Sequence, residues 1–497
     1  MSHMMTLHQA SQWIGSAELI GNGQTKLTRV HTDSRSIEPG DLFVALKGER
    51  YDANEFLTDA ATKGAAAIIC ESRESLLKAG LPGLVVSDTR AALGVLATAW
   101  REQFKLPLIA VTGSNGKTTV TQMIAAILRV YRPTSMLATQ GNFNNDIGVP
   151  LTLLRIRAEH QIAVLELGMN HPGEIAHLAT MAKPSVALVN NAQREHLEFM
   201  ATLDAVAHEN GSVIGCLPAN GVSVYPSADE FSPSWHHLSG QRAQLTFGIA
   251  SGSEPSMNSN ARLTSGADVS CALPEWIDGA WRLQVITPAG DLQVNLRIAG
   301  AHNVKNALAA IACSLACGVP LEAIARGLDS FEPVKGRTRA LFGDINGTKF
   351  TLIDDTYNAN PDSVRAAIDV LAGLPHPRLL VLGDMGEVGS NGPRFHAEAG
   401  EYAKALGIES LITVGDLSAI ASAQFGSGIH KAKMVDVKKV VLEALPLHHS
   451  ILVKGSRFMQ MEQIVEAIMV AGNRNAQASK SSESLSKNAS LKEAKCS

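Results

Sequence analysis

The sequence has few cysteines, no long apolar run and no signal peptide. Its six cysteines are scattered without a C-x-x-C pair, which argues against a zinc site and is typical of a reducing compartment where thiols stay free. No apolar stretch approaches the roughly 20 residues needed to cross a bilayer, and the N-terminus lacks a basic segment followed by an apolar one. We therefore expect a cytoplasmic protein without a membrane anchor.

The sequence also lacks an excess of positive charge. Lys and Arg number 43 against 47 Asp and Glu, giving a net charge of -4, so no broad positive field is available for a nucleic acid. We expect no nucleic-acid partner. With 497 residues, 45% of them hydrophobic, the chain exceeds what one hydrophobic core usually organises, and three domains are expected.

The middle of the chain alternates strand and helix patterns. "LPLIAVTG" (106–113) is a short apolar run, a glycine loop follows, and "KTTVTQMIAAILRV" (117–130) has helical apolar spacing. Further strands are expected at 161–169, 186–192 and 221–226, a surface loop between 250 and 270, and a β-hairpin at 282–300. The alternation predicts an α/β domain over 105–330, with a mostly parallel sheet covered on both faces.

Two further α/β units flank this middle part. The first, over 1–104, is small and carries the apolar runs "DLFVAL", "AAAIIC" and "GLVVSD". The second, over 331–471, alternates the strands "KFTLIDD", "RLLVLGDM", "SLITVGD" and "SILVKGS" with helical segments, which predicts a Rossmann-like doubly wound domain. Residues 472–497 have too little apolar surface to fold, and we expect a disordered tail.

The glycine loop "AVTGSNGKTTV" (110–120) is the first candidate site. It departs from the usual P-loop pattern because Val111 stands where the first glycine is expected. The turn still points several backbone N–H groups at one spot before a helix, which favours phosphate binding. Lys117 is placed to add a charge for the terminal phosphates, and the Thr118 hydroxyl is placed to bind Mg²⁺.

Other candidates follow the ends of later strands. Glu166 ends a buried strand and suits a metal ligand, unless a cation that the sequence does not reveal pairs with it. His196 follows the next strand, where a structural role is an equal alternative. Arg337 could reach the phosphates across a cleft, or could belong to a charged surface loop.

Taken together, the motifs resemble those of the Mur ligases, the ATP-dependent amide-bond-forming enzymes of peptidoglycan synthesis. "TGSNGKTT", "LELGMN", "REHLE", "AGAHNVKNALAA", "KGRTR", "DDTYNANPDS", "VLGDMGEVG" and "VKGSRFM" come in the family's order across all three domains. "GNFNNDIGVPLTLLR" and "VLGDMGEVG" resemble the member that adds D-alanyl-D-alanine to a UDP-N-acetylmuramoyl-tripeptide. The resemblance implies a cytoplasmic ligase, here expected to be a monomer, that works through an acyl phosphate.

The resemblance also implies roles for individual residues. Lys117, Glu166 and His196 would be catalytic, and Thr118, Glu166 and His196 would hold Mg²⁺. Ser34 and Arg35 would contact the UDP end of the substrate, in the domain over 1–104. ATP would be bound by Gly113, Ser114, Asn115, Gly116, Lys117, Thr118, Thr119, Asn303, Asn306, Arg337 and Asp355. The third domain would close over the second, because Arg337 and Asp355 lie far from the glycine loop in sequence.

The chain departs from the family at one position. Most members carry a lysine shortly after the site histidine, converted by CO₂ to a carbamate that holds a second Mg²⁺. This chain has no lysine between Lys183 and Lys305, and Asn210 stands at the usual position beside Glu209. We expect Asn210 or Glu209 to support the second metal and catalysis to be independent of bicarbonate. The alternative is that Asn210 and the following glycine end a helix.

Two rival functions remain open from the sequence. Folylpolyglutamate synthetase shares the loop and the acyl-phosphate chemistry, although the "DSR" region near the N-terminus argues against it. A nucleotide-dependent switch without enzymatic activity would use the glycine loop and leave Glu166 and His196 as scaffold.

Overall fold

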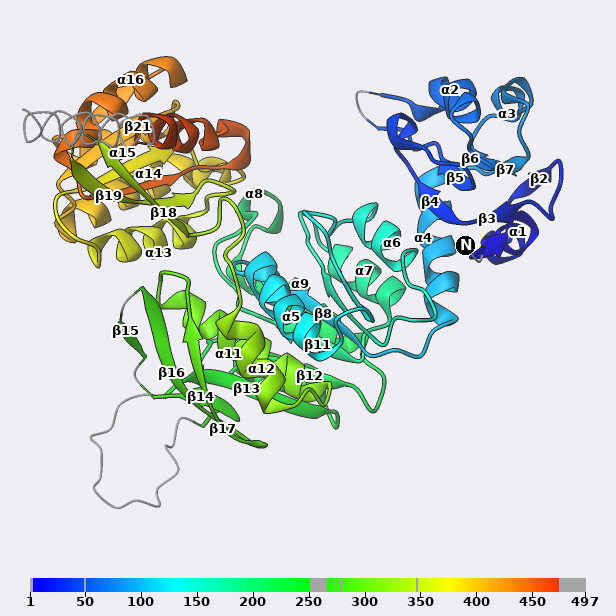
Figure 1. Cartoon of the computed structure of the whole chain (residues 1–497), viewed down its shortest axis with the longest axis horizontal. Coiled ribbons are helices and arrows are strands. Elements are labelled where there is room, and N and C mark those ends of the chain that lie inside the picture. The colour runs from blue at the N-terminus through cyan, green and yellow to red at the C-terminus, as the bar shows by residue number, and fades with distance from the viewer. Residues whose placement is uncertain are drawn as a thin grey trace, which may run out of the picture.

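The computed structural model describes residues 3–48, 51–250, 266–272, 274–277, 279–345 and 347–472. Figure 1 shows three bodies, one in the first hundred residues, a central one, and one formed by the C-terminal part of the described chain. Each body contains its own mixed or mostly parallel sheet. The predicted α/β class is therefore confirmed. Within the described ranges, no helix combines the length and apolar character needed to span a bilayer.

The N-terminal body is built on a small sheet with parallel and antiparallel pairs. Its strand order is β2 (Glu18–Ile20), β7 (Gly83–Val85), β6 (Ala67–Cys70), β5 (Asp41–Val44) and β4 (Arg29–His31). A separate antiparallel pair joins β1 (Met5–Thr6) and β3 (Lys26–Leu27). The helices are α1 (Leu7–Ile14), α2 (Leu57–Thr62), α3 (Arg73–Ala79) and α4 (Thr89–Glu102). The three predicted apolar runs form β5, β6 and β7.

The central body contains the longest sheet, which is parallel except at one edge. The strand order is β15 (Glu275–Ile277), β16 (Ala280–Thr287), β14 (Val269–Cys271), β13 (Ala243–Ile249), β12 (Val222–Pro226), β11 (Val186–Val189), β8 (Leu108–Thr112), β10 (Ile162–Glu166) and β9 (Met136–Ala138). The predicted hairpin is β16 with β17 (Gly290–Leu296), paired antiparallel. Most of the surface loop expected between 250 and 270 lies outside the described residues.

Helices cover both faces of this central sheet. They are α5 (Lys117–Tyr131), α6 (Gly148–Leu153), α7 (Glu174–Ala182), α8 (Leu197–Met200), α9 (Leu203–Gly215), α10 (Ser232–Ser239), α11 (His302–Ala316) and α12 (Leu321–Asp329). Strand β8 shows why its sequence is a continuous apolar run. Leu108 and Ala110 pack into one hydrophobic core and Ile109 and Val111 into the other, so neither face of the strand meets water.

The C-terminal body is a second doubly wound unit. Its strand order is β18 (Arg339–Ile345), β19 (Thr348–Asp355), β23 (Ser450–Lys454), β20 (Arg378–Gly383), β21 (Ser410–Val414) and β22 (Ile429–Lys431), parallel except for β18 with β19. Its helices include α13 (Pro361–Ala372), α14 (Gly392–Ala405), α15 (Ser418–Phe425) and α16 (Met434–Ala444). A final helix runs from 462 to 472. A disordered tail was expected over 472–497, and its residues beyond 472 lie outside the described residues.

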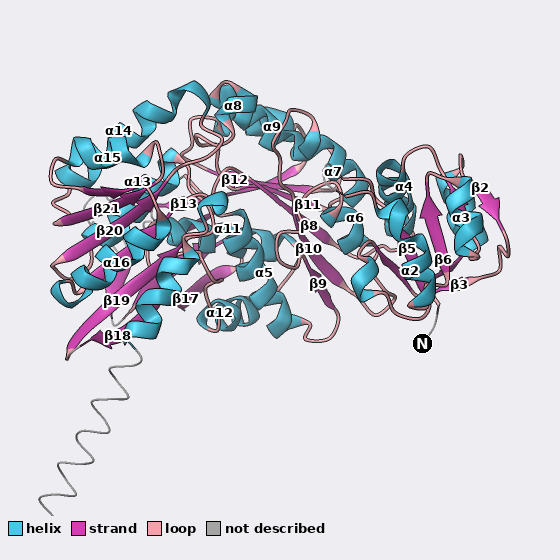
Figure 2. Ribbon diagram, turned by 90° about the horizontal axis from the view of Figure 1, so that it is seen from above, coloured by secondary structure: helices cyan, strands magenta, loops and turns pink. Residues whose placement is uncertain are grey.

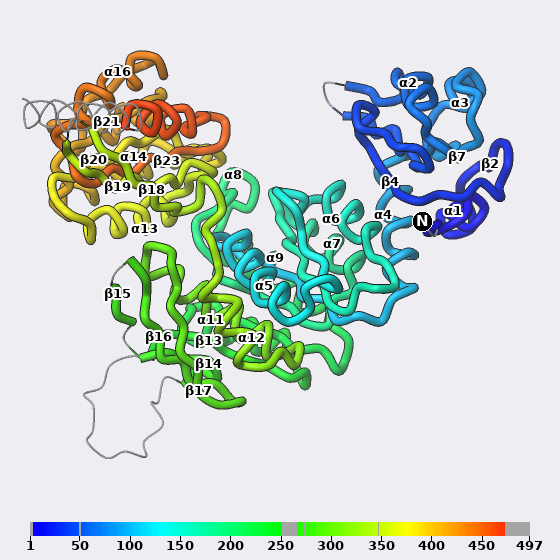
Figure 3. The backbone as a smooth tube through the Cα atoms, in the orientation of Figure 1, coloured from blue at the N-terminus to red at the C-terminus, as the bar shows by residue number. Residues whose placement is uncertain are grey.

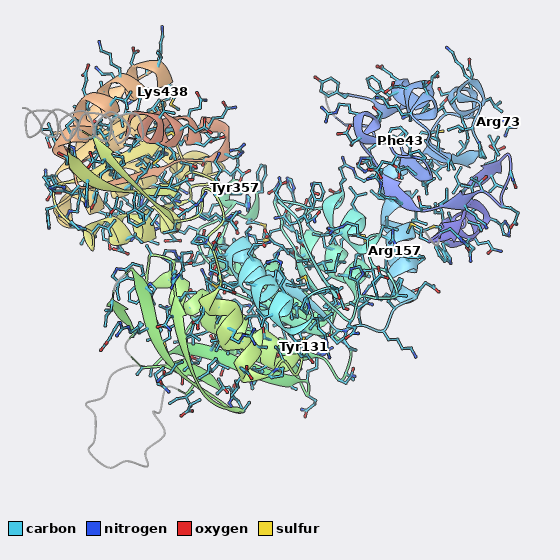
Figure 4. The ribbon with its side chains drawn as sticks, viewed as in Figure 1. Phe43, Arg73, Tyr131, Arg157, Tyr357 and Lys438 are labelled. Carbon is cyan, nitrogen blue, oxygen red and sulfur yellow. The ribbon has the colours of Figure 1, made fainter. Side chains whose placement is uncertain are left out.

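The bodies meet along two boundaries. Helix α4 leads from the N-terminal body into the central one, and Figure 4 labels Arg157 beside it, where its Nη2 donates to the Thr28 carbonyl at 3.0 Å. The other boundary lies between the central and C-terminal bodies, where Figures 2 and 3 place the short helix α8 beside the C-terminal body. Figure 4 labels Tyr357 on the side of the C-terminal body that faces the central body. The boundary between the central and C-terminal bodies borders the candidate site.

Candidate functional site

A cavity of about 1350 Å³ lies between the central and C-terminal bodies and reaches Arg90 on α4. It lies beyond the carboxyl ends of β8, β10 and β11, which is where ligands bind in open parallel sheets. Twelve of the predicted site residues line it: Ser114, Asn115, Gly116, Lys117, Thr118, Thr119, Glu166, His196, Asn303, Asn306, Arg337 and Asp355. The structure therefore brings together residues that are far apart in the sequence.

The glycine loop is held in a conformation that only glycine adopts easily. Gly113 and Gly116 have φ values of +128° and +82°, in a region where a Cβ is strained. There is also no room for one, since a Cβ on Gly116 would lie 2.5 Å from Asn306 Oδ1 and one on Gly113 would lie 2.9 Å from Asn190 Cβ. Helix α5 then begins at Lys117. The strand, turn and helix start that the sequence predicted are confirmed.

A chain of buried amides supports this loop from below. Asn306 Nδ2 donates to Asn303 Oδ1 at 2.8 Å, and Asn190 Nδ2 donates both to Asn306 Oδ1 at 2.9 Å and to the Asn115 carbonyl at 2.8 Å. The Asn303 amide also donates to a backbone carbonyl at 2.7 Å. Asn303 and Asn306 line the cavity and hold the loop in place, while their predicted contact with adenine stays a prediction.

Lys117 lies in the loop with every ammonium donor engaged. Its Nζ donates to the Gly113 carbonyl at 2.6 Å, to the Ser114 carbonyl at 3.2 Å and to Glu195 Oε1 at 3.0 Å. Both side chains of the ion pair are largely buried, with 13% and 8% of their surface exposed. The Glu195 carboxylate is therefore the anionic partner of the Lys117 ammonium in this structure. Glu195 is part of the "REHLE" motif but was not among the predicted site residues.

Glu166 has the surroundings of a cation ligand. Only 2% of the residue is exposed, at the end of β10. Its Oε1 accepts from Asn144 Nδ2 at 2.8 Å, and within the described chain its buried Oε2 has no hydrogen-bond partner. A buried carboxylate oxygen without a partner is costly unless a cation binds it. Among the described residues, no group of three or more His, Cys, Asp and Glu side chains is arranged to hold a metal ion by itself, so a Mg²⁺ at Glu166 would need waters or substrate phosphates as its other ligands.

His196 lies between two carboxylates. Its Nε2 is 3.5 Å from Glu195 Oε1 and its Nδ1 is 2.6 Å from Glu387 Oε2, the latter an ion pair without the angles of a hydrogen bond. Burial opposes protonation, but the two carboxylates outweigh it and raise the pKa of His196 to about 9. The imidazole is therefore protonated at neutral pH in this state. The predicted metal-ligand role of His196 requires that one ring nitrogen lose its proton, and Nε2 can do so while Nδ1 keeps its contact with Glu387.

The C-terminal body contributes cationic and anionic groups to the cavity. The Arg337 guanidinium stacks on the Tyr357 ring, 4.0 Å from its centroid, and within the described chain its buried Nε has no hydrogen-bond partner. Asp355 Oδ2 accepts from Lys454 Nζ at 2.6 Å. The Arg337 Nε is thus a donor for which an anion would be an acceptor, and the predicted phosphate contact of Arg337 stays a prediction. Lys454 is part of the "VKGSRFM" motif but was not among the predicted site residues.

The expectation that Asn210 or Glu209 supports a metal is wrong in this structure, because neither lines the cavity. Asn210 Oδ1 accepts from the Gly113 N–H at 2.7 Å and its Nδ2 donates to a carbonyl within α9. The Glu209 oxygens accept from the N–H groups of Gly173 and Ile175, both at 2.8 Å. Asn210 therefore anchors the glycine loop and Glu209 caps the start of α7. The alternative of a helix end is also wrong, since α9 continues to Gly215.

Ser34 and Arg35 lie outside the cavity. They belong to a short 3-10 turn over Ser34–Ser36 in the N-terminal body. The Arg35 guanidinium is 86% exposed and its Nη2 is 2.7 Å from Asp33 Oδ2. Arg35 is exposed but paired with Asp33, and the contact of Ser34 and Arg35 with a substrate stays a prediction.

Three family models match the chain along its length. The Mur ligase family catalytic domain matches residues 26–101, the Mur ligase middle domain matches 111–314, and the Mur ligase glutamate ligase domain matches 336–494. Together these three matches span most of the sequence.

Named relatives and solved structures agree with these matches. The UDP-N-acetylmuramoyl-tripeptide--D-alanyl-D-alanine ligase of Escherichia coli is 41% identical, over 94% of this chain and 99% of that protein. The crystal structure of MurF from Acinetobacter baumannii superposes with a TM-score of 0.84 at 35% identity, covering 93% of this chain and 98% of that one. MurF from Thermotoga maritima in complex with ADP gives 0.75 at 25% identity, over 90% and 98% of the two chains. Folylpolyglutamate synthase from Thermotoga maritima, at 16% identity and 0.54, shares the fold alone.

Proposed function

Because this chain belongs to the Mur ligase family, we propose that the cavity between its central and C-terminal bodies is where it carries out an ATP-dependent ligation. The chain is an amide-bond-forming ligase that joins D-alanyl-D-alanine to a UDP-N-acetylmuramoyl-tripeptide, a step of peptidoglycan precursor synthesis. One observation supports the assignment to this cavity. The glycine loop with Lys117, the unpartnered Glu166 oxygen and the Arg337 guanidinium all line the same space.

The chemistry follows from the poor reactivity of a carboxylate. An oxygen of the tripeptide's terminal carboxylate attacks the γ-phosphorus of ATP, the bond to the β-phosphate oxygen breaks, and ADP leaves. The dipeptide amine then attacks the acyl carbon, the carbon–oxygen bond to phosphate breaks, and the amine loses a proton. One amide, ADP and phosphate are formed. Excluding water from the cavity protects the acyl phosphate from hydrolysis.

Lys117 and Arg337 would neutralise the charge of the transferring phosphoryl group. Lys117 lies at the start of α5, where the loop N–H groups also point at an anion. Glu195 Oε1 lies 3.0 Å from the Lys117 ammonium, and we propose that the ATP phosphates replace this carboxylate. Arg337 would approach from the C-terminal body, and Asp355 would contact the ribose.

Glu166 and the Thr118 hydroxyl are the residues that would hold Mg²⁺. When bound, Mg²⁺ offsets the repulsion between the anionic nucleophile and the phosphates. Asn144 orients the Glu166 carboxylate by donating to its Oε1. His196 would join the ligand set only after losing the proton that Glu195 and Glu387 stabilise.

We assign a part of the reaction to each domain. Residues 1–104 would hold the UDP end of the substrate through Ser34 and Arg35, 105–330 would bind ATP, and 331–471 would close over it. We further propose that the enzyme is a cytoplasmic monomer, in keeping with its use of ATP and with the free cysteines among the described residues.

The decisive assay is product analysis. The protein is incubated with ATP, D-alanyl-D-alanine and UDP-N-acetylmuramoyl-tripeptides that differ in the third residue, and the products are weighed by mass spectrometry. We expect one dipeptide added per ADP formed, with no phosphate release when either substrate is omitted. Phosphate release that needs neither substrate would indicate a nucleotide switch. In a parallel reaction with ATP, glutamate and a folate, ligation would indicate folylpolyglutamate synthetase activity.

A further inference from the structure

Arg194 joins the central body to the C-terminal body. Its Nε and Nη2 donate to Asp362 Oδ1 at 3.0 and 2.7 Å, and its backbone N–H donates to Asp362 Oδ2 at 2.8 Å. Its Nη1 donates to Glu398 Oε2 at 2.9 Å, and the guanidinium lies over the Phe395 ring, 5.2 Å from the centroid. A single side chain thus contacts three residues of the other body.

These contacts fix two helices at once. Asp362 is in the first turn of α13, and Phe395 and Glu398 lie on α14. The three charged side chains are only 23% to 27% exposed, so the pairs are screened less than surface ion pairs. A planar guanidinium with several donors in fixed directions also defines an orientation, which a lysine ammonium does not.

The segment that carries Arg194 is the same one that supports the glycine loop. Next to Arg194, the Gln193 N–H donates to Ser114 Oγ at 2.9 Å, and Glu195 contacts Lys117 at 3.0 Å. On one side this segment thus contacts the phosphate-binding residues, and on the other side Arg194 contacts the C-terminal body. A shift of α13 and α14 would therefore move the residues that contact the glycine loop.

A second contact ties the same helix directly to the loop. Asn360 is the N-cap residue of α13, and its Nδ2 donates to Asn115 Oδ1 at 2.9 Å. Only four residues separate Asn360 from Asp355, so the start of α13 and the cavity-lining end of β19 are parts of one short connection. The position of α13 therefore sets the position of Asp355 over the cavity.

We propose that Arg194 is a positioning residue for ligation: by holding α13 and α14 against the central body, it places Arg337 and Asp355 opposite the glycine loop. The inference rests on the proposed function, since it concerns the geometry of that same cavity. Arg194 itself does not line the main cavity. Its effect is on the alignment of groups that do, and misplacement of reacting groups by about 1 Å can cost on the order of 100-fold in rate.

The test compares Arg194→Ala and Arg194→Lys with a matched control. Arg394 donates to the other oxygen of the same carboxylate, Glu398 Oε1, at 3.1 Å, but lies on α14 itself and is 76% exposed. Arg394→Ala therefore removes an arginine from the same cluster without touching the contact between bodies. For each variant, kcat, the KM values and the amide hydrogen exchange of α13 and α14 are measured, with kcat normalised to the folded fraction.

We expect Arg194→Ala to lower kcat by about 10- to 100-fold with little change in the KM of the UDP-linked substrate. Arg194→Lys should retain part of the rate, millimolar guanidinium should restore part of it to Arg194→Ala, and Arg394→Ala should stay within about twofold of wild type. A normalised kcat for Arg194→Ala equal to wild type would overturn the positioning role, and so would equal losses in the Arg194 and Arg394 variants. A wild-type protein that does not ligate would overturn the proposed function, and with it the role of Arg194.

Discussion

Replacing Lys117 by methionine should lower both the rate of ligation and the thermal stability, and a second substitution should restore the stability alone. Methionine keeps the length of the apolar stem but removes the ammonium that contacts Gly113, Ser114 and Glu195. Loss of one preorganised group that stabilises developing charge commonly costs about 10²- to 10³-fold in kcat, or roughly 3–4 kcal/mol. We expect ligation to fall by at least that factor.

The same substitution leaves Glu195 buried with less compensation. This residue is 7% exposed, and its other cationic neighbour is His196, at 3.5 Å. A buried polar group that loses its partner costs about 1–3 kcal/mol, and a charged group costs more. For a unit of the size of the central body we therefore expect a fall in Tm of roughly 2–12 °C or more. In the double variant Lys117→Met, Glu195→Gln no uncompensated charge remains, so the stability should largely return.

The assays are phosphate release in the presence of both substrates and thermal unfolding followed by circular dichroism. The control is Lys183→Met, which removes a lysine paired with Glu102 at the surface, where each side chain is about half exposed. We expect the control to be unchanged in both assays, the single variant to be inactive and destabilised, and the double variant to be inactive but stable. A double variant that ligates near the wild-type rate would refute the role given to Lys117.

Three other substitutions and one change of buffer give distinct results. Glu166→Gln should raise the Mg²⁺ concentration for half-maximal activity by about tenfold or more, because the carboxylate is the preferred ligand, and an unchanged Mg²⁺ titration would remove it from the metal site. Asn210→Ala should lower stability by about 1–3 kcal/mol, measured by urea unfolding, because the Gly113 N–H loses its acceptor; its Mg²⁺ titration should match wild type. Gly116→Ala should abolish binding of an ATP analogue, measured by calorimetry, since its Cβ would lie 2.5 Å from Asn306 Oδ1. Ligation should proceed equally in CO₂-depleted and bicarbonate-supplemented buffer, and restoration by bicarbonate would contradict this expectation.

The parts of the fold that the sequence predicts best are those with buried, continuous apolar runs. Strand β8, the glycine loop and α5 follow from a run whose two faces are both covered and from glycines that the turn requires. The edge strands β9, β18 and β22 were not predicted, because an edge strand has a neighbour on one side only and needs no such run.

The candidate site also has features that the sequence predicts and features that it does not. Glu166 was predicted because a carboxylate at the end of a buried parallel strand is costly unless a cation binds it. The pairing of His196 with Glu387 was not predicted, since it depends on how the C-terminal body sits against the central one, which no local pattern encodes. Asn210 was given the wrong role, because its amide faces the backbone of the glycine loop and not the cavity.

The most direct test of the central claim is to follow oxygen from the tripeptide. The acceptor carboxylate is labelled with ¹⁸O in both positions, ligation is run to completion with unlabelled ATP and water, and phosphate and product are analysed by mass spectrometry. Because the carboxylate oxygen becomes the bridge of the acyl phosphate and leaves with phosphorus, we predict one ¹⁸O in each released phosphate and one in the new amide. Phosphate free of ¹⁸O, formed in step with the amide, would contradict activation of the carboxylate by phosphoryl transfer.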